Sequence, residues 1–261
     1  MTMERAVFVP DLDRLPLDGP YDRLYLGSEF CVWRLPGAVE LREALAAATR
    51  RGMGFSLVTP FLDEPGLART LALVRALPED TATEVIANDL GLIESLRGDG
   101  WRGTVVAGRL LTRQRRGPGF QSFGDLPPEA AAALRGSALD APAFVALLGS
   151  VYGVKRFELD DLVQGVVVPV VPAGVQLSLY RPYLLVTATR NCPWVCGGRI
   201  WDRSRGCARP CRGQALGLAP AAPRGGRQLL LGGCAQFLEH RNEAPPPAGV
   251  DRVVWQPGIP A

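Results

Sequence analysis

The stretch from residue 23 to residue 61, RLYLGSEFCVWRLPGAVELREALAAATRRGMGFSLVTPF, decides the fold. Residues 23–28 and 55–61 read as two buried strands, because both are apolar runs bounded by glycine or proline. Between them, residues 37–52 carry apolar side chains at helical spacing. A strand, a helix and a second strand in this order predict a parallel pair joined by a crossover helix.

The same alternation runs through the rest of the chain. Further strands are predicted at residues 5–10, 83–89, 103–112, 154–160, 175–190 (with a possible break) and 250–257, and helical segments at 64–78, 90–100 and 129–149. Eight strands predict an α/β fold, a (β/α)8 TIM-like barrel that need not be complete, because its later units are poor in helix. We expect residues 1–261 to form one such domain, with a loosely structured tail after the last cysteine of the loop at 191–211. The first strand is not followed by G-x-G-x-x-G, which argues against a dinucleotide-binding sheet.

Composition narrows the function classes. The net charge of +3 argues neither for nor against nucleic acid, and 47% hydrophobic residues suffice for a sizeable core. Neither a secretory leader nor an apolar run of about 18 residues is apparent, so we expect a cytoplasmic protein with reduced thiols and no membrane span. His240 is the only histidine, in a proline-rich segment where we expect it at the surface. Hydrolysis by a histidine-based triad is therefore disfavoured.

Four of the six cysteines lie in one loop, NCPWVCGGRIWDRSRGCARPC, residues 191–211. In a cytosolic protein this density indicates metal or redox chemistry. One interpretation is a zinc site formed by two C-x3-C pairs, Cys192 with Cys196 and Cys207 with Cys211. The other is a four-iron cluster, which accepts looser spacing and takes four thiolates: Cys31, Cys192, Cys207 and Cys211. Cys234 reads as an incidental buried thiol.

The predicted barrel bears on the remote cysteine. Cys31 lies just past the strand 23–28, and Cys192 lies just past the strand that ends at residue 190. Function in these barrels sits at the carboxyl ends of the strands, so both cysteines are expected on one face. A metal centre there can draw on both.

Four polar residues at strand ends are candidates for catalysis. Asn88 and Asp89 end the fourth predicted strand, although the same position suits a helix N-cap. Glu158 and Asp160 lie two residues apart on one face of the sixth strand, as an acid/base pair or as side chains paired with arginine. The sequence leaves both alternatives open for each pair.

Arginines form two dense groups: Arg109, Arg113, Arg115 and Arg116 in one run, and Arg199, Arg203, Arg205, Arg209 and Arg212 around the cysteine loop. A solvated surface loop is the default interpretation. Guanidinium groups near a metal centre also suit a bidentate carboxylate or an RNA phosphate. Trp194 and Trp201 flank the cysteines, which is thin support for base stacking.

Several segments resemble the iron–sulfur proteins formerly grouped as collagenase-like peptidases. These are YDRLYLGSEFCVWR at 21–34, TEVIANDLGLI at 83–93, VKRFELD at 154–160 and VDRVVWQPG at 250–258. The resemblance implies a barrel that binds a four-iron four-sulfur (4Fe-4S) cluster through Cys31, Cys192, Cys207 and Cys211. Cys196 has no counterpart in the pattern. Peptidase activity is not expected, since neither a nucleophile–base pair nor a zinc-protease motif is visible.

The resemblance also implies a function. Relatives hydroxylate the ubiquinone ring, or tRNA and rRNA bases, without oxygen, with prephenate as the hydroxyl donor. We therefore expect an iron–sulfur component of a quinone-ring hydroxylase that acts with a paralogous subunit, on a quinone precursor and a prephenate-like anionic donor. The alternatives are an RNA-hydroxylating member of the family and a non-catalytic metal-binding partner subunit.

Overall fold

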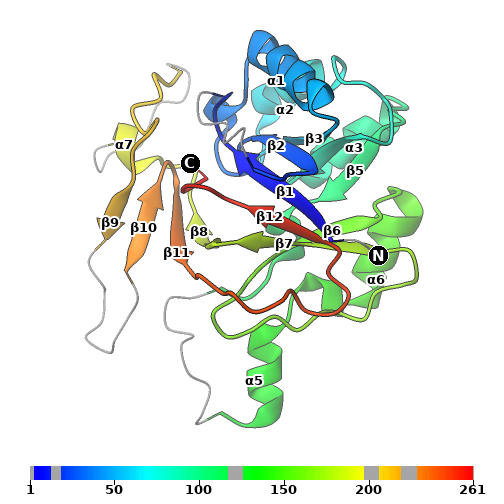
Figure 1. Cartoon of the computed structure of the whole chain (residues 1–261), viewed down its shortest axis with the longest axis vertical. Helices are drawn as coiled ribbons and strands as arrows, with labels where there is room; N and C mark the ends of the chain where they lie inside the picture. The colour runs from blue at the N-terminus through cyan, green and yellow to red at the C-terminus, as the bar shows by residue number, and fades with distance from the viewer. Residues whose placement is uncertain (1–2, 13–18, 117–125, 197–205, 219–227, 261) are drawn as a thin grey trace.

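The computed structural model describes residues 3–12, 19–116, 126–196, 206–218 and 228–260. Eight parallel strands close into a barrel in the order β1-β12-β7-β6-β5-β4-β3-β2 (Figure 1). The strands are β1 (Glu4–Val9), β2 (Arg23–Gly27), β3 (Gly54–Val58), β4 (Thr83–Ala87), β5 (Thr104–Ala107), β6 (Arg156–Asp160), β7 (Gln176–Arg181) and β12 (Arg252–Trp255). The predicted (β/α)8 TIM-like barrel is confirmed.

The helices cover only the first half of the barrel, as the helix-poor later units indicated. Helices follow β2, β3, β4 and β5, whereas β6 joins β7 without one. They are η2 (Val32–Arg34), α1 (Ala38–Arg50), α2 (Glu64–Val74), α3 (Leu90–Gly98), α4 (Arg109–Thr112), α5 (Pro128–Arg135), η3 (Ala138–Asp140), α6 (Pro142–Ala146) and η4 (Leu147–Val151). The short helix α7 (Pro193–Cys196) comes later in the chain, after β7. Within the described residues, no helix is long and apolar enough to cross a membrane.

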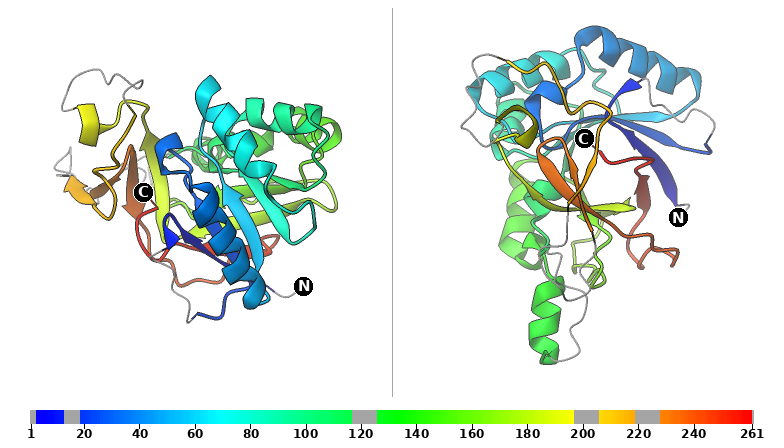
Figure 2. Two further views of the ribbon diagram at one scale, coloured as in Figure 1. Left: turned by 90° about the horizontal axis from the view of Figure 1, so that it is seen from above. Right: turned by 90° about the vertical axis from the view of Figure 1, so that its left-hand side faces the viewer.

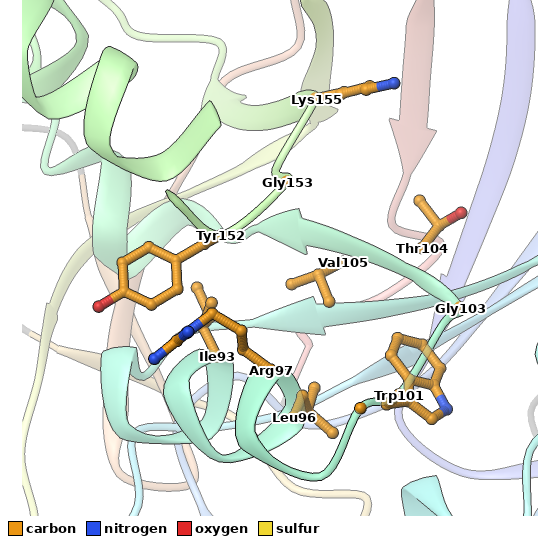
Figure 3. A pocket seen from close by; sticks show the side chains of 11 residues that line it. Ile93, Leu96, Arg97, Trp101, Gly103, Thr104, Val105, Tyr152, Gly153 and Lys155 are labelled. Atoms are coloured by element: carbon orange, nitrogen blue, oxygen red, sulfur yellow. The ribbon is translucent and has the colours of Figure 1, made fainter. Parts of the chain in front are cut away.

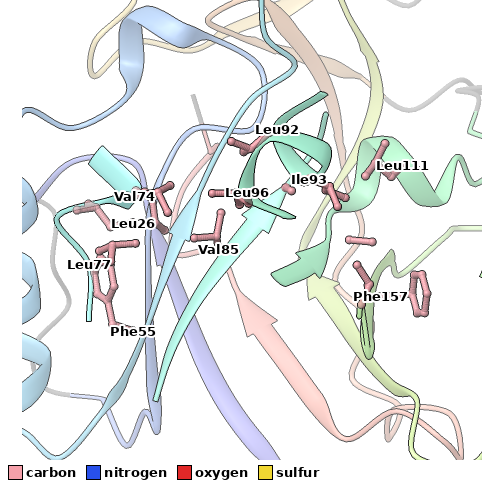
Figure 4. Close-up of a cluster of buried hydrophobic side chains, with 14 of the residues drawn as sticks. Leu26, Phe55, Val74, Leu77, Val85, Leu92, Ile93, Leu96, Leu111 and Phe157 are labelled. Atoms are coloured by element: carbon pink, nitrogen blue, oxygen red, sulfur yellow. The ribbon is translucent and has the colours of Figure 1, made fainter. Parts of the chain in front are cut away.

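The main apolar core lies between these helices and the outer face of the barrel (Figure 4). Alternate strand residues such as Leu26 and Val85 point outward and pack against Val74 and Leu92 of the helices. The outward-facing residues of each strand recur every second position, and they pack against the apolar face of each helix. Both periods are visible in the sequence, so the sequence predicted both kinds of element.

The predicted strand 103–112 is too long. β5 ends at Ala107, Gly108 follows in extended conformation, and α4 begins at Arg109. The apolar run of the sequence does not mark this boundary, because Leu110 and Leu111 continue it into the helix. The short α4 places Arg109 at the mouth of the barrel, which matters for the site.

The predicted strand 175–190 is two strands in two different sheets. β7 stays in the barrel, and after Pro182 the chain continues as β8 (Tyr183–Ala188). β8 belongs to a four-stranded antiparallel sheet ordered β8-β11-β10-β9, with β9 (Leu216–Leu218), β10 (Leu229–Gly232) and β11 (Ala235–Glu239). Figures 1 and 2 show this second sheet beside the barrel.

The expectation of a loosely structured tail after Cys211 is therefore wrong. Leu229–Gly232 and Ala235–Glu239 pair as an antiparallel hairpin, and Phe237 of that hairpin is fully buried against Phe30 with ring centroids 5.4 Å apart. The many proline and glycine residues nearby made this segment look irregular in the sequence. Its two short strands are buried only through contacts with a distant part of the chain.

Polar and aromatic layers fill the barrel interior. At the amino-terminal end, Arg252 forms a bidentate ion pair with Glu84, with nitrogen–oxygen distances of 2.7 and 2.9 Å. In the middle, Phe8, Tyr25 and Tyr180 pack ring against ring, with centroids 6.2 to 6.4 Å apart. These layers close the amino-terminal end and the middle of the barrel, which leaves the carboxyl-terminal mouth as the place for a functional site.

Candidate functional site

Cys31 lies just beyond the carboxyl end of β2. It caps the short helix η2, its backbone N–H donates to Ser28 Oγ at 3.3 Å, and its carbonyl accepts from Arg34 N at 3.0 Å. The backbone N–H groups of Trp33 and Arg34 also point at its sulfur. Donors converging on a thiol favour the thiolate, the form that binds metal.

The cysteine loop starts at the end of β8. Cys192 is 5% exposed and precedes α7, and Cys211 is 3% exposed. Cys207 is half-buried, and its sulfur accepts a hydrogen bond from Arg209 N at 3.3 Å. Arg199, Arg203, Arg205 and Trp201 lie outside the described residues.

The four cysteines predicted as ligands lie in one region of the structure. The charge of Cys31 acts on both Cys192 and Cys207, and that of Cys211 acts on the same two thiols. The buried guanidinium of Arg34 lies 3.9 Å from Cys211 Sγ and also acts on Cys31. The route differs from the predicted one, since Cys192 follows a strand of the second sheet rather than a barrel strand.

Cys234 is 5% exposed, as expected of a buried thiol, and it lies beside Cys31. It lies in the turn between β10 and β11, donates its S–H to the carbonyl of Phe30 at 3.1 Å, and is hydrogen-bonded to the side chain of Cys31. Its carbonyl accepts from Thr189 N at 2.9 Å, three residues before Cys192. The signal available in the sequence was the Gly-Gly-Cys turn between two apolar runs at 228–240.

The thiols differ in acidity. The hydrogen bond with Cys234 lowers the pKa of Cys31 to about 6. Burial opposes this shift, and the backbone N–H groups of Trp33 and Arg34 add to it. The same hydrogen bond and burial raise the pKa of Cys234. Burial raises the pKa of Cys192 and of Cys207. Within this pair, the contacts favour the thiolate at Cys31 and the thiol at Cys234.

Cys196 is the sixth thiol and ends α7. Its backbone N–H bonds to the carbonyl of Cys192 at 2.9 Å, so it lies one helical turn further along the chain, and it is half-buried. The choice between Cys192 and Cys196 as ligand stays a prediction in favour of Cys192, the more deeply buried of the two.

The donor set consists of thiols, which both zinc and an iron–sulfur cluster accept. Four thiolates around zinc must each come within about 2.3 Å of one point. In the described part of the chain, no three His, Cys, Asp or Glu side chains converge so closely. A four-iron cluster is larger and takes four thiolates from its corners. Cys31, Cys192, Cys207 and Cys211 are the residues that would hold it, with Arg34 beside its negative charge.

Asn88 and Asp89, the first pair of catalytic candidates, have structural partners. Asn88 is fully buried, donating to the carbonyl of Thr59 and accepting from Leu110 N, both at 2.9 Å. Asp89 is the N-cap of α3 and accepts from Leu92 N at 3.1 Å. The helix-cap interpretation is confirmed for Asp89, and a catalytic role for either residue stays a prediction.

Glu158 and Asp160, the second pair, point into the barrel but differ in charge. Burial raises the pKa of Glu158 to about 8, against the hydrogen bond that Tyr180 Oη donates to Oε2 at 2.6 Å. Burial alone would also raise the pKa of Asp160, but the charges of Arg109 and Arg116 outweigh it and lower that pKa. The pKa values of the two carboxyl groups are therefore shifted in opposite directions, and their catalytic role stays a prediction.

The arginine run is not a solvated loop throughout. Arg109 is fully buried and forms ion pairs with both Glu29 and Asp160. Arg116 Nε lies 2.6 Å from Asp160 Oδ2. The default surface interpretation is therefore wrong for Arg109 and Arg116, whereas Arg113 and Arg115 are exposed. Arg109 also lies 4.0 Å from the centre of the Tyr180 ring, which belongs to the middle layer of the barrel interior. The buried ion pairs therefore lie directly over that layer, at the mouth of the barrel.

A pocket of about 380 Å³ lies beside the thiol centre, between the mouth of the barrel and β8. We call it the mouth pocket; it is lined by Phe30, Phe61, Leu110, Leu185, Val186, Thr187 and Ala188, with Thr189, Arg116 and Arg190. Arg190 lies 4.2 Å from the centre of the Phe61 ring and donates to the carbonyl of Leu62 at 3.2 Å. Apolar walls with two guanidinium groups suit a ring that carries an anionic group.

The mouth pocket and the thiol centre share their supports. Phe30 precedes Cys31, and its carbonyl accepts the S–H of Cys234. Thr189 N binds the carbonyl of Cys234, and Arg190 lies two residues before Cys192. A molecule in the pocket is therefore in the neighbourhood of whatever the thiols hold.

A second pocket, of about 390 Å³, lies at the amino-terminal end of β5, between α3 and the segment before β6 (Figure 3). Trp101, Tyr152 and Arg97 line it, together with Lys155, the only lysine of the chain. It opens at the opposite end of the strands from the cysteines, and function in such barrels sits at the carboxyl end.

Comparisons with known proteins add little. No family model matches the chain, and no curated protein does. A solved structure of a U32 peptidase has 17% sequence identity and a TM-score of 0.45, over 100% of this chain and 95% of the other. That likeness carries no argument about activity. The fold and the site define the class: a (β/α)8 barrel with several buried cysteines beside its carboxyl-terminal mouth.

Proposed function

We propose that this chain is the 4Fe-4S component of an oxygen-independent hydroxylase for a quinone ring, acting with a paralogous subunit. The observation that carries the proposal is the gathering of Cys31, Cys192, Cys207 and Cys211 beside the mouth pocket. The sequence resemblance behind the quinone assignment is to the ubiquinone-biosynthesis protein UbiV, whose paralogue would be a UbiU-like subunit. Peptidase chemistry is not proposed.

The chain's own residues would bind and orient the reactants. The apolar side chains of Phe30, Phe61 and Leu185 would hold the ring of a quinone precursor and exclude water from it. Arg190 would hold a carboxylate, as on a prephenate-like donor, because a guanidinium binds a carboxylate in a planar, two-pronged geometry. When bound, the cluster would supply electron transfer.

Arg34 would serve the cluster rather than the substrate. It is 3% exposed and ion-paired with Asp11 at 2.7 Å, so its position is fixed before any ligand binds. A fixed cation beside thiolate ligands offsets part of their negative charge. Its aim at Cys211 is consistent with this role.

Anaerobic purification followed by iron, sulfide and zinc analysis tests the metal part of the proposal. We expect about four iron and four sulfide per chain, as four-thiolate ligation implies. A protein with one tightly bound zinc and no sulfide would overturn it.

Gene deletion tests the reaction. Cells lacking the protein should accumulate an under-hydroxylated quinone precursor without oxygen and make normal quinone in air. A missing hydroxyl on tRNA or rRNA with normal quinone would assign the chain to RNA instead. If this chain co-purifies with a paralogue and shows no turnover by itself, it is a non-catalytic partner of that paralogue.

A further inference from the structure

The second pocket, at the amino-terminal end of β5, has no part in the proposed function. We call it the Trp101 pocket. Its volume of about 390 Å³ lies within the range of about 300–1,000 Å³ that small-molecule sites occupy. Ile93, Leu96 and Val105 give it apolar walls, and Trp101 and Tyr152 lie on opposite sides of it (Figure 3). A cavity of this size and lining can hold a small ligand with a flat, largely apolar body.

The indole of Trp101 is held in place by the chain around it. A Cβ atom at Gly103 would meet Cζ2 of the indole at 2.3 Å, so a glycine there lets the ring lie against the backbone. Trp101 N donates to the carbonyl of Leu96 at 3.0 Å, and the side chain packs against the main core. The ring is therefore positioned before any ligand binds. Aromatic side chains of this kind are platforms on which nucleobases stack, each such contact contributing about 1–3 kcal/mol.

The charged residues that line the pocket, Arg97 and Lys155, are both cations. Arg97 is already engaged, because its Nε and Nη2 lie 3.3 and 2.5 Å from the carboxylate of Glu94. Lys155 forms no ion pair within the residues that the structure describes. Its backbone is fixed, since its carbonyl accepts from Gln176 N at 2.7 Å, and its side chain is exposed at the pocket. It is the only lysine among 29 lysine and arginine residues, and a lysine ammonium acts as a compact point charge for a phosphate group.

We propose that the Trp101 pocket binds a nucleoside monophosphate, with the base against Trp101 and Tyr152 and the phosphate at Lys155. Thr104, which begins β5 beside the segment that leads from Lys155 into β6, offers a hydroxyl donor for the same phosphate. The site lies at the amino-terminal end of the strands, whereas catalysis in such barrels takes place at the carboxyl end. The nucleotide is therefore bound and not converted. The proposal is independent of the proposed function, because it involves neither the cysteines nor the mouth pocket.

The test is calorimetric titration of the full chain with adenosine monophosphate, and with adenosine as the probe that lacks the phosphate. Lys155→Met should raise Kd for the monophosphate about tenfold or more, because a charged contact is lost. Lys155→Arg keeps the positive charge and should bind more tightly than the methionine variant. Adenosine should bind more weakly than the monophosphate, and equally well to wild type and Lys155→Met. Trp101→Leu, with its folding checked by thermal unfolding, should weaken both probes. Arg190→Met, in the mouth pocket, is the matched control and should change neither Kd.

Three results would overturn the proposal. The first is wild-type protein that does not bind the monophosphate. The second is equal affinity of wild type and Lys155→Met, which would leave the phosphate without its assigned partner. The third is weaker binding in Arg190→Met with unchanged binding in Lys155→Met, which would move the nucleotide to the mouth pocket. The two lysine variants and the adenosine comparison decide the matter even if Trp101→Leu does not fold, since Lys155 is exposed.

Discussion

Arg109 and Glu29 form a fully buried ion pair across 80 positions of sequence, with Arg109 Nε 2.9 Å from Glu29 Oε1. Glu29 lies two residues before Cys31, and Arg109 opens α4 between β5 and the mouth pocket. The pair therefore fixes the segment that presents Cys31. Asp160 on β6 forms a second ion pair with Arg109 from the other side of the mouth.

Replacing Arg109 by methionine should destabilise the protein strongly. The carboxylate of Glu29 would remain buried without its partner and Asp160 would keep only Arg116, and a broken buried pair costs about 3–5 kcal/mol. Urea unfolding followed by circular dichroism measures the change. Arg75→Met is the matched control: its pair with Asp99 is exposed, and such pairs contribute about 0–1 kcal/mol. Equal effects of the two substitutions would contradict the assigned role.

Serine substitution should separate the ligands from the remaining loop cysteine. Cys31→Ser should lose iron and sulfide as completely as Cys192→Ser, Cys207→Ser and Cys211→Ser, because each removes one of four thiolate ligands. Cys196→Ser should keep both. Iron and sulfide analysis of anaerobically purified variants is the measurement. Full iron in Cys31→Ser with loss in Cys196→Ser would place all four ligands in the loop.

Glu158 should make the protein less stable as pH rises. Its pKa is raised from 4.5 to about 8, so the stability present below pH 4.5 is lost progressively up to about pH 8. Tyr180, Tyr25, Glu29 and Arg252 are the polar groups that act on it. Glu158→Gln cannot ionise, so its free energy of unfolding should exceed that of the wild type by more at pH 8 than at pH 5. Glu43→Gln, at an exposed position of α1, controls for charge alone. An unchanged difference between the two pH values would show that Glu158 does not titrate in this range.

Arg190→Met should weaken binding of a cyclic carboxylate in the mouth pocket. A charged hydrogen bond contributes about 1.5–3 kcal/mol, so Kd for a probe such as a hydroxybenzoate should rise about tenfold or more. Isothermal titration calorimetry measures Kd. Arg97→Met, in the pocket at the opposite end of the strands, is the control and should leave it unchanged. If both variants bind as the wild type does, the mouth pocket is not the carboxylate site.

Asp89 offers a test of cap against catalyst. Asp89→Ala should lower stability by about 1 kcal/mol or more, because Leu92 N and Leu62 N both lose their acceptor, whereas Asp89→Ser keeps an N-cap oxygen for Leu92 N and part of that stability. Thermal unfolding gives the stability of both variants. If Asp89 acts only as a cap, the serine variant should also retain quinone-ring hydroxylation in cells. Loss of hydroxylation in a stable serine variant would restore the catalytic interpretation.

The sequence by itself determined the barrel and most of its strands. Apolar runs such as residues 55–61 and the helical stripe of 37–52 are local patterns, and their period follows from backbone geometry alone. The cap formed by Asp89 is also local, since it depends on the N–H group of Leu92 three residues along the chain. The density of cysteines in 191–211 also predicts a metal-binding thiol centre, which stays a prediction.

Only the tertiary structure decided the rest. It placed β8 in a second sheet, paired β10 with β11, brought Cys234 to Cys31 and buried Arg109 between Glu29 and Asp160. Each of these depends on contacts between residues far apart in sequence. A short strand or a lone arginine has no local signal for its partner, because burial and charge pairing are properties of the packed chain and not of the segment.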